Sequence, residues 1–403
     1  MNNPIPIPSL PPSPRCVMIS AGEASGDLHG ANLVRAMRRE CGSLFFCGIG
    51  GSAMKAAGVK IIVDADRLSV VGITEVLARL PSILNGMSAA RKILRSRVPD
   101  LLILIDFPDF NLKLAAVARE QGIPVFYYIT PQVWAWRQGR IHTIKQLVDR
   151  AAVILPFEDG FFRKHNIPVS FVGHPLLDAG YGISPTAAQW RPGETPVIGF
   201  LPGSRNKEVR RLLPVMLETA EVISRKNRQA RFLVSCAPSV SRELFDRIAA
   251  PFAGRVDCET VTDKVESFLQ RTTLVVAASG TVTLEAALSA TPAVVVYRVS
   301  LLSYWLGRML INLQHVSLIN LIAEREVVPE LLQAAAAPET IASEAMGILE
   351  DAQKFNAIRD GLLEVRRRLG DSGASGRAAG IALEMLSGGQ AVLPAGDSLK
   401  QLT

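Results

Sequence analysis

Short apolar runs alternate with amphipathic segments along most of the chain. Residues 16–20, 101–105 and 125–129 in the first half, and 197–201 and 274–277 in the second, have the length and apolarity of buried strands. Each run leads through a turn into a segment with apolar residues at helical spacing. This repeated order of strand, turn and helix predicts an α/β fold built on parallel sheets.

The length of 403 residues is long for one domain and sufficient for two. The stretch between Asp178 and Pro196 has the composition of a linker. We therefore expect an N-terminal domain over residues 15–178 and a C-terminal domain over 197–387. Residues 1–14 hold six prolines and no basic residue, which predicts a disordered leader and not a signal peptide, and residues 388–403 are expected to form a tail.

Composition and charge narrow the classes of partner. The net charge of +7 suits an anionic partner, such as a phosphorylated substrate or an anionic membrane, and no nucleic-acid-binding motif is present. The five cysteines are scattered and lack CxxC spacing, which favours reduced thiols and no metal site. The apolar run at 299–323 is interrupted by polar side chains, which argues against a spanning helix.

The segment 197–209 is the first candidate for a ligand site. It is predicted to run from a strand through a turn into a helix. In the turn, Gly203 permits close approach of a ligand, Ser204 offers a helix cap and a hydroxyl, and Arg205 places a fork of donors beside the positive helix end. These features suit a phosphate. A capped helix with a solvated arginine is the alternative.

A second junction of the same kind follows residues 274–277. The small residues Ser279, Gly280 and Thr281 lead into a helix that carries Glu285. In an open parallel sheet such turns lie at one edge, so both junctions are expected to face one ligand. One turn would hold a phosphate while Glu285 accepts from a ribose hydroxyl pair, which predicts a nucleotide.

Carboxylates take the corresponding places in the first half. Glu23 and Asp27 lie in the turn after strand 16–20, which suits sugar hydroxyls or acid–base chemistry better than a diphosphate, although Asp27 has a helix cap as its alternative role. Asp106 ends strand 101–105 beside Phe107. An apolar environment there would raise the pKa of Asp106 and suit it as a general base.

An oxidoreductase is the alternative that one glycine cluster supports. Gly48, Gly50 and Ala53 follow an apolar strand and approximate a dinucleotide-binding fingerprint. The helix behind them is short, and neither Asp64 nor Asp66 has the position expected of the ribose-binding acid. The match is incomplete.

The segment 68–84 carries more apolar residues than one buried helix face needs. Val76, Leu77 and Leu80 belong to this surface, and basic residues follow it from Arg91 onward. An apolar segment with basic neighbours suits a membrane interface or acyl chains. A helix buried on all sides is the alternative.

Two tryptophans and an arginine follow strand 125–129. Trp134, Trp136 and Arg137 form an amphipathic group that suits packing on a sugar ring. A plug in the protein core is the alternative.

Six motifs together resemble the lipid-A-disaccharide synthases, a family of type-B glycosyltransferases. They are Ser-Ala-Gly-Glu-Ala-Ser-Gly-Asp (20–27), Ile-Asp-Phe-Pro-Asp-Phe-Asn (105–111), Pro-Gln-Val-Trp-Ala-Trp-Arg (131–137), Leu-Pro-Gly-Ser-Arg (201–205), Ala-Ser-Gly-Thr (278–281) and Val-Ser-Leu-Ile-Asn (316–320). The resemblance covers about residues 15–386. It implies two doubly wound, Rossmann-like halves that face a cleft. Ala24 and Phe107 stand where family members usually carry threonine and alanine, and neither change removes a charge or a donor.

The resemblance also implies a reaction. An inverting transfer would join 2,3-diacylglucosamine from its UDP derivative to the 6-hydroxyl of 2,3-diacylglucosamine 1-phosphate, giving UDP and the β-1′,6-linked disaccharide 1-phosphate of lipid A biosynthesis. No cofactor or metal is implied. The enzyme would be cytoplasmic and bound peripherally to the inner membrane of a Gram-negative bacterium, and whether it forms a homodimer stays open.

The expected roles follow from the residues and the resemblance together. Gly203, Ser204, Arg205, Ser279, Gly280 and Thr281 would bind the UDP diphosphate, Glu285 its ribose, and Asn320 would lie near the nucleotide. Asp106 is the first choice for the base and Glu23 the second. Val76, Leu77 and Leu80 would hold acyl chains at the membrane, and Trp136 and Arg137 would contact the acceptor. A UDP-sugar 2-epimerase and a non-catalytic nucleotide sensor are the remaining alternatives.

Overall fold

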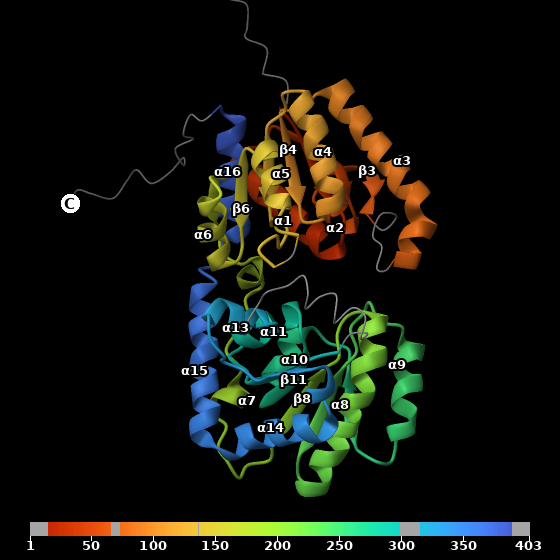
Figure 1. Cartoon of the computed structure of the whole chain (residues 1–403), viewed down its shortest axis with the longest axis vertical. Helices are drawn as coiled ribbons and strands as arrows, with labels where there is room; N and C mark the ends of the chain where they lie inside the picture. The colour runs from red at the N-terminus through yellow and green to blue at the C-terminus, as the bar shows by residue number, and fades with distance from the viewer. Residues whose placement is uncertain (1–14, 66–72, 136, 299–314, 389–403) are drawn as a thin grey trace, which may run out of the picture.

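The computed structural model describes residues 15–65, 73–135, 137–298 and 315–388, and side chains within helix residues 73–80 are not described. The predicted leader (1–14) and residues 389–403 of the predicted tail lie outside these ranges. The chain forms two lobes, each built on one parallel sheet with helices on its faces (Figure 1). The predicted α/β class is confirmed.

The first lobe has a seven-stranded sheet in the order β3-β2-β1-β4-β5-β6-β7. Its strands are β1 (Arg15–Ala21), β2 (Leu44–Gly50), β3 (Lys60–Asp64), β4 (Leu101–Ile105), β5 (Val125–Tyr128), β6 (Arg150–Val153) and β7 (Val169–Phe171). Its helices are α1 (Ala24–Glu40), α2 (Ser52–Ala56), α3 (Ile73–Arg97), α4 (Pro108–Glu120), α5 (Arg140–Leu147) and α6 (Pro156–Lys164).

The second lobe repeats the pattern in a six-stranded sheet in the order β10-β9-β8-β11-β12-β13. Its strands are β8 (Val197–Leu201), β9 (Arg231–Ser235), β10 (Cys258–Val261), β11 (Leu274–Ala278), β12 (Ala293–Tyr297) and β13 (Glu330–Leu332). Its helices are α7 (Pro185–Ala188), α8 (Asn206–Lys226), α9 (Arg242–Ala249), α10 (Val265–Gln270), α11 (Thr281–Leu288), α13 (Leu318–Ala323), α14 (Pro338–Glu350) and α15 (Ala352–Arg368).

The apolar pattern explains why these segments fold as they do. Every residue of β4 and β11 is buried, as expected for central strands of a parallel sheet covered on both faces. Helix α8 buries Val209, Leu212 and Met216, which recur at helical spacing along one face. Strand β10 begins at Cys258, where its parallel pairing with Phe232 of β9 begins.

The strand order gives each lobe one point where the winding reverses. In the first sheet this switch point lies between β1 and β4, and in the second between β8 and β11, since these central neighbours are far apart in sequence. Loops at the carboxyl ends of strands flanking a switch point form the usual ligand crevice of open α/β sheets. The loops after β1, β4, β8 and β11 are therefore where ligands are expected.

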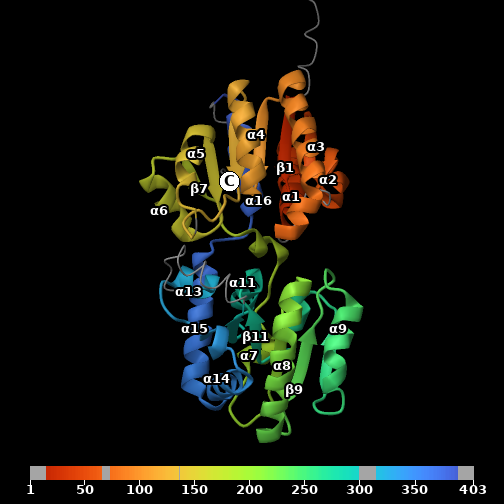
Figure 2. The ribbon, with the colours of Figure 1, turned by 45° about the vertical axis from the view of Figure 1, so that its right-hand side comes forward.

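The chain crosses between the lobes twice. The first crossing follows β7 directly and contains the short 3₁₀ helix η2 (Pro175–Ala179), and the second lies between α15 and helix α16 (Ala374–Leu386). Because β7 is parallel to its neighbours, the carboxyl edge of the first sheet lies on the side that leads into the second lobe. Both connections lie between the lobes in Figures 1 and 2.

Helix α16 returns to the first lobe. Its apolar residues Ala378, Ala379, Ala382 and Leu383 belong to the buried cluster on one face of the first sheet, and α16 packs along α1 (Figure 1). The sequence predicted that residues 197–387 all belong to the second domain. For α16 this is not so, because the helix packs on the first lobe. The alanine-rich face fits closely against α1, and nothing in its spacing indicates which sheet it covers.

Candidate active site

A cavity of about 270 Å³ in the second lobe lies between its two switch-point turns. It brings together most of the residues expected to bind the nucleotide, which are Gly203, Ser204, Arg205, Ser279, Gly280, Thr281 and Glu285. Two turns separated by more than seventy residues thus line one hollow. Their meeting follows from the adjacency of β8 and β11 in the sheet.

The turn between β8 and α8 is closed by a carboxylate of its own helix. Glu208 Oε2 accepts hydrogen bonds from the backbone N–H of Ser204 at 3.1 Å and of Arg205 at 3.3 Å. Gly203 has φ +109°, and a Cβ atom there would lie 2.4 Å from Glu208 Oε2, so only glycine fits. The positive end of α8 is already occupied by an internal anion.

Arg205 is held loosely at the mouth of the cavity. Its Nη1 lies 3.4 Å from Glu208 Oε1, and its side chain is 54% exposed. An exposed ion pair of this kind is weak, so the guanidinium can turn to another anion at little cost.

The turn between β11 and α11 is open. Gly280 is the N-cap residue of α11 and provides no side-chain cap, and none of the described side chains accepts a hydrogen bond from the first turn of this helix. Ser279 Oγ donates to the carbonyl oxygen of Val316 at 3.4 Å, which ties the turn to the segment before α13. The first backbone N–H groups of α11 thus remain as donors beside the cavity, where the helix end favours negative charge.

Glu285 lies one turn further along α11 and also lines the cavity. Burial raises the pKa of its carboxyl group, and a hydrogen bond from the hydroxyl of Tyr181 opposes that shift. Tyr181 belongs to the first crossing between the lobes and was not singled out from the sequence. Tyr181 lies inside the linker-like stretch between Asp178 and Pro196, so no strand or helix pattern indicated a contact with Glu285.

Asn320 does not reach this cavity. Its side chain is fully buried; its Oδ1 accepts from the N–H groups of Val327 and Val328, and its Nδ2 donates to the Val328 carbonyl oxygen and to Glu330. Every hydrogen-bonding position of the amide is therefore used to hold the loop after α13. The expected contact with the nucleotide is replaced by a structural role.

In the first lobe, Asp106 lies in a constrained turn after β4. Asp106 and Phe107 have φ values of +45° and +50°, which are unusual for residues other than glycine. The Asp106 carbonyl oxygen accepts from Asn111 Nδ2 at 2.7 Å and from the Tyr127 hydroxyl at 2.8 Å. Asn111 also accepts from Ser20 Oγ at 2.6 Å, which joins the turns after β1 and β4.

The same contacts bring Asp106 close to Glu23. Burial and, to a smaller extent, the negative charge of Glu23 together raise the pKa of Asp106 to about 6, while a backbone N–H at Phe107 acts in the opposite direction. Gly22 explains how the turns approach each other, since a Cβ atom at this position would lie 2.3 Å from the Phe107 ring. The predicted raised pKa and proximity to Phe107 are present.

The family described as "Lipid-A-disaccharide synthetase" matches residues 17–383. The chain belongs to the lipid-A-disaccharide synthase family. A lipid-A-disaccharide synthase of Syntrophus aciditrophicus is 47% identical over 92% of this chain and 98% of its own length. The corresponding enzymes of Geobacter sulfurreducens and Myxococcus xanthus are 45% and 43% identical over 92% and 94% of this chain, and 97% and 99% of theirs. The prediction of a glycosyltransferase of lipid A biosynthesis is confirmed.

Solved structures of low sequence identity share the fold of this family member. A putative UDP-N-acetylglucosamine 2-epimerase from Listeria monocytogenes superimposes with a TM-score of 0.62 at 13% identity, covering 93% of this chain and 97% of its own. MurG of Acinetobacter baumannii gives a TM-score of 0.58 at 14% identity, covering 92% and 100%. The two-lobed, type-B glycosyltransferase architecture is thereby confirmed.

The glycine cluster that suggested an oxidoreductase has a different use in this synthase-family chain. Helix α2 contains five residues, and the Asp27 carboxylate accepts from the N–H groups of Gly51, Ala53 and Met54 at 2.7, 2.9 and 3.1 Å. An internal anion fills the place that a pyrophosphate takes in a dinucleotide site. Asp27 is a helix cap, as its alternative role proposed, but it caps α2 and not the helix that contains it.

Several residues expected to contact the acceptor sugar or the membrane lie outside the described residues or have undescribed side chains. Trp136 lies outside the described residues, and Val76, Leu77 and Leu80 lie in α3 with undescribed side chains. Arg137 is exposed, and its Nη1 lies 3.4 Å from Asp109 Oδ1.

Trp134, which the sequence groups with Trp136 and Arg137 as a surface for packing on a sugar ring, is half-buried. It donates from Nε1 to Glu158 Oε1 at 2.9 Å and packs edge-on against Phe157. This side chain therefore serves packing, as in the alternative interpretation.

Metal binding and membrane spanning leave marks that a structure can show. Within the described ranges, no group of three or more histidine, cysteine, aspartate or glutamate side chains is placed to hold a metal ion. Of the helices that the structure describes, none has a stretch that is both long and apolar enough to span a bilayer.

Proposed function

We propose that the chain transfers 2,3-diacylglucosamine from its UDP derivative to the 6-hydroxyl of 2,3-diacylglucosamine 1-phosphate. The main support for this proposal is the cavity between the β8–α8 and β11–α11 turns. It combines a guanidinium, an open helix N-terminus and a carboxylate, which are the groups that a nucleoside diphosphate needs. The first lobe supplies a carboxylate with raised pKa at its own switch point.

The diphosphate is assigned to the open end of α11 and to Arg205. The N–H groups at the start of α8 are poorer candidates, because Glu208 already accepts from Ser204 and Arg205. Arg205 reaches the phosphates with its side chain, while Ser279, Gly280 and Thr281 provide the helix end. Glu285 accepts from the ribose hydroxyls with the carboxylate oxygen that Tyr181 leaves free.

The transfer step is assigned to Asp106. Its carboxylate removes the proton from the acceptor 6-hydroxyl as the hydroxyl oxygen forms a bond to the anomeric carbon from the face opposite UDP. The bond between the anomeric carbon and the phosphate oxygen breaks, and its electron pair leaves with UDP. Arg205 and the α11 N-terminus stabilise the negative charge that develops on the leaving group. Attack from the opposite face inverts the configuration.

The pKa of Asp106 suits this role. With a pKa of about 6, the carboxyl group is mostly ionised at pH 7 and yet more basic than an ordinary aspartate. Glu23 contributes by its charge and is the second candidate for the base.

Membrane contact is proposed for the N-terminal part of α3. Val76, Leu77 and Leu80 would enter the interface of the cytoplasmic face of the inner membrane and hold acyl chains, with Arg91 and Lys92 next to anionic headgroups. Replacing Leu77 and Leu80 by aspartate should release the protein from vesicles containing anionic lipid. Unchanged co-sedimentation would reject this membrane contact. Separately, light scattering on the same protein decides whether it is a homodimer.

The reaction is tested by product analysis. The protein is incubated in detergent with UDP-2,3-diacylglucosamine and 2,3-diacylglucosamine 1-phosphate, and the products are identified by mass spectrometry. We expect a disaccharide 1-phosphate and one equivalent of UDP. An isomerised donor without disaccharide would indicate a UDP-sugar epimerase, and UDP binding without turnover would indicate a nucleotide-binding module.

A further inference from the structure

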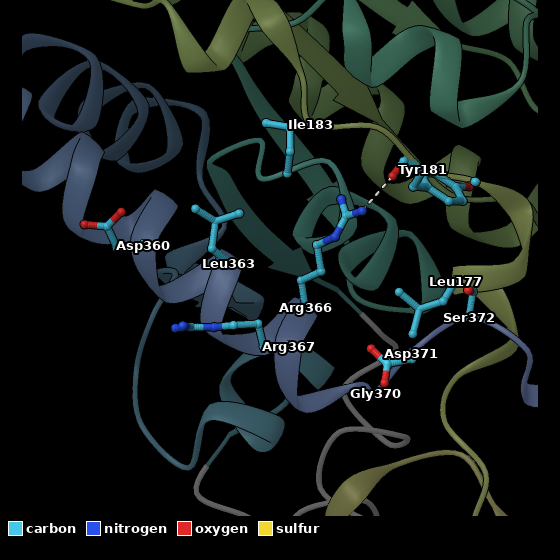
Figure 3. A pocket seen from close by; sticks show the side chains of 11 residues that line it. Leu177, Tyr181, Ile183, Asp360, Leu363, Arg366, Arg367, Gly370, Asp371 and Ser372 are labelled. Atoms are coloured by element: carbon cyan, nitrogen blue, oxygen red, sulfur yellow. Dashed lines mark hydrogen bonds between the residues drawn. The ribbon is translucent and has the colours of Figure 1, made fainter. Parts of the chain in front are cut away.

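Tyr181 links the first crossing between the lobes to the nucleotide cavity. Its side chain is 9% exposed, and its hydroxyl donates to Glu285 Oε1. Its carbonyl oxygen accepts from Arg366 Nη2 at 3.0 Å, as the dashed line in Figure 3 shows. Arg366 belongs to the last turn of α15, directly before the second crossing. Tyr181 therefore contacts both the last turn of α15 and a cavity-lining carboxylate.

The same neighbourhood holds the far end of α11. Arg366 Nη1 donates to the carbonyl oxygen of Leu288, the last residue of that helix. Ser184 N–H, three residues after Tyr181, donates to the Ser289 carbonyl oxygen at 2.8 Å. The first crossing and Arg366 thus hold α11 at its C-terminal end, while Tyr181 holds the carboxylate on its side.

The first crossing is equally fixed to the first lobe. Asp178 accepts from the N–H groups of Gly373 at 2.5 Å and of Ala374 at 3.3 Å, at the start of α16. Three residues later the chain reaches Tyr181. The backbone that carries Tyr181 is therefore held by contacts to α15 and to the start of α16.

One side of this segment faces open space. A cavity of about 1110 Å³ lies between the two crossings and is lined by Tyr181, Ile183, Arg366 and Gly370 among others (Figure 3). The ring itself is buried in the hydrophobic core of the second lobe, and its hydroxyl is fixed by the hydrogen bond to Glu285.

We propose that Tyr181 is a positioning residue for ribose recognition. Its hydroxyl occupies one oxygen of Glu285, so that the other oxygen is turned toward the ribose hydroxyls of UDP. This inference rests on the proposed assignment of Glu285 to the ribose. Tyr181 itself touches neither the sugar nor the phosphates.

Removing the Tyr181 hydroxyl distinguishes a role in ribose recognition from a role in stabilising the fold. For the protein and its Tyr181→Phe variant, calorimetry measures the dissociation constants of UDP and of 2′,3′-dideoxy-UDP, which lacks the ribose hydroxyls. We expect the native preference for UDP to fall by about tenfold in the variant, because the carboxylate is no longer oriented. Binding of the dideoxy compound should change little.

Burial of Glu285 adds a pH signature. The Tyr181 hydrogen bond favours the ionised carboxylate, so its loss raises the pKa of Glu285 further. As the pH is lowered and Glu285 becomes protonated, the preference for UDP over dideoxy-UDP should be lost. In Tyr181→Phe this loss should occur at a higher pH than in the native protein. A purely structural change would weaken both ligands alike at every pH.

A matched control is Tyr128→Phe, which removes a buried phenol hydroxyl from β5 of the first lobe, outside the nucleotide cavity. It should keep the native preference. In a Glu285→Ala background, Tyr181→Phe should have no additional effect, because its action passes through that carboxylate.

The outcomes separate the inference from its foundation. If the native protein binds UDP and dideoxy-UDP equally, the assignment of Glu285 to ribose is wrong. If the native protein prefers UDP and Tyr181→Phe keeps the whole preference, or weakens both ligands equally, the positioning role is wrong.

Discussion

The two lobes share one topology and carry opposite charges at the same place. In the first lobe, the turns after β1 and β4 present Glu23 and Asp106. In the second, the equivalent turns after β8 and β11 present Arg205 and the open N-terminus of α11. A parallel sheet fixes where a ligand can bind, but the residues in its turns decide whether the site holds an acid or an anion.

Within the second lobe the two turns differ again. The α8 helix end is closed by Glu208, whereas α11 has no side-chain cap. At a strand–turn–helix junction, the N–H groups at the start of the helix can therefore be satisfied by the protein itself, as in α8, or remain available for an anion, as in α11. The following changes test these contrasts, starting with the largest expected effect.

Asp106→Asn tests the acidic lobe. Removing the base should lower kcat by at least about a hundredfold, because an amide cannot accept the proton of the acceptor hydroxyl. The KM for the UDP-sugar should stay within a few-fold. Steady-state rates of disaccharide formation measure both, with Asp159→Asn, a partly exposed carboxylate paired with Arg163, as control. A mild loss would transfer the role of base to Glu23.

Arg205→Ala tests the cationic lobe. Loss of one donor to the leaving group should lower kcat by about tenfold to a hundredfold. Arg225→Ala, in the last turn of the same helix and paired with Glu221 on the surface, is the matched control and should keep native turnover. Near-normal turnover of Arg205→Ala would remove this residue from the leaving-group site.

Glu23→Gln refines the pairing of the carboxylates. The charge of Glu23 raises the pKa of Asp106, so its removal lowers that pKa. Because the base acts in its ionised form, the acidic limb of kcat/KM for the acceptor, expected near pH 6, should move to lower pH by less than about one unit. Rates from pH 4.5 to 8 measure this shift. A loss of all activity would indicate that Glu23 itself takes the proton.

Glu208→Gln tests the contrast between α8 and α11 with the smallest expected effect. If the diphosphate binds at α11, neutralising the cap of α8 should leave the dissociation constant of UDP within about threefold and cost about 0.5–1 kcal/mol of stability. Calorimetry and thermal unfolding measure the two quantities. A UDP affinity that rises tenfold would show that Glu208 and the diphosphate compete for one place.

Much of this arrangement could be predicted from the sequence, for a physical reason. The apolar strands that lead into Asp106, Arg205 and Ser279 have a local pattern, and parallel sheets place the ends of such strands at one edge. Helices α14, α15 and α16 close the described part of the chain, as the absence of proline from residues 339–386 favours. Fold class and the meeting of Arg205 with Ser279 followed from these local signals.

The remaining features depend on contacts between distant residues. Asn320 has the sequence context of a site residue, but its amide is consumed by Val327 and Val328, which only the folded loop brings near. Tyr181 meets Glu285 across about a hundred residues of sequence. Asp27 caps a helix other than its own. Hydrophobic periodicity carries no information on such pairings.

The position of α16 has a consequence for how the protein is made. The ribosome releases the last turn of this helix only after the whole second lobe has been synthesised, so one face of the first lobe waits uncovered in the meantime. A fragment ending near residue 178 should therefore aggregate or bind chaperones. Joining residues 374–388 to that fragment through a short flexible tether should restore its cooperative unfolding.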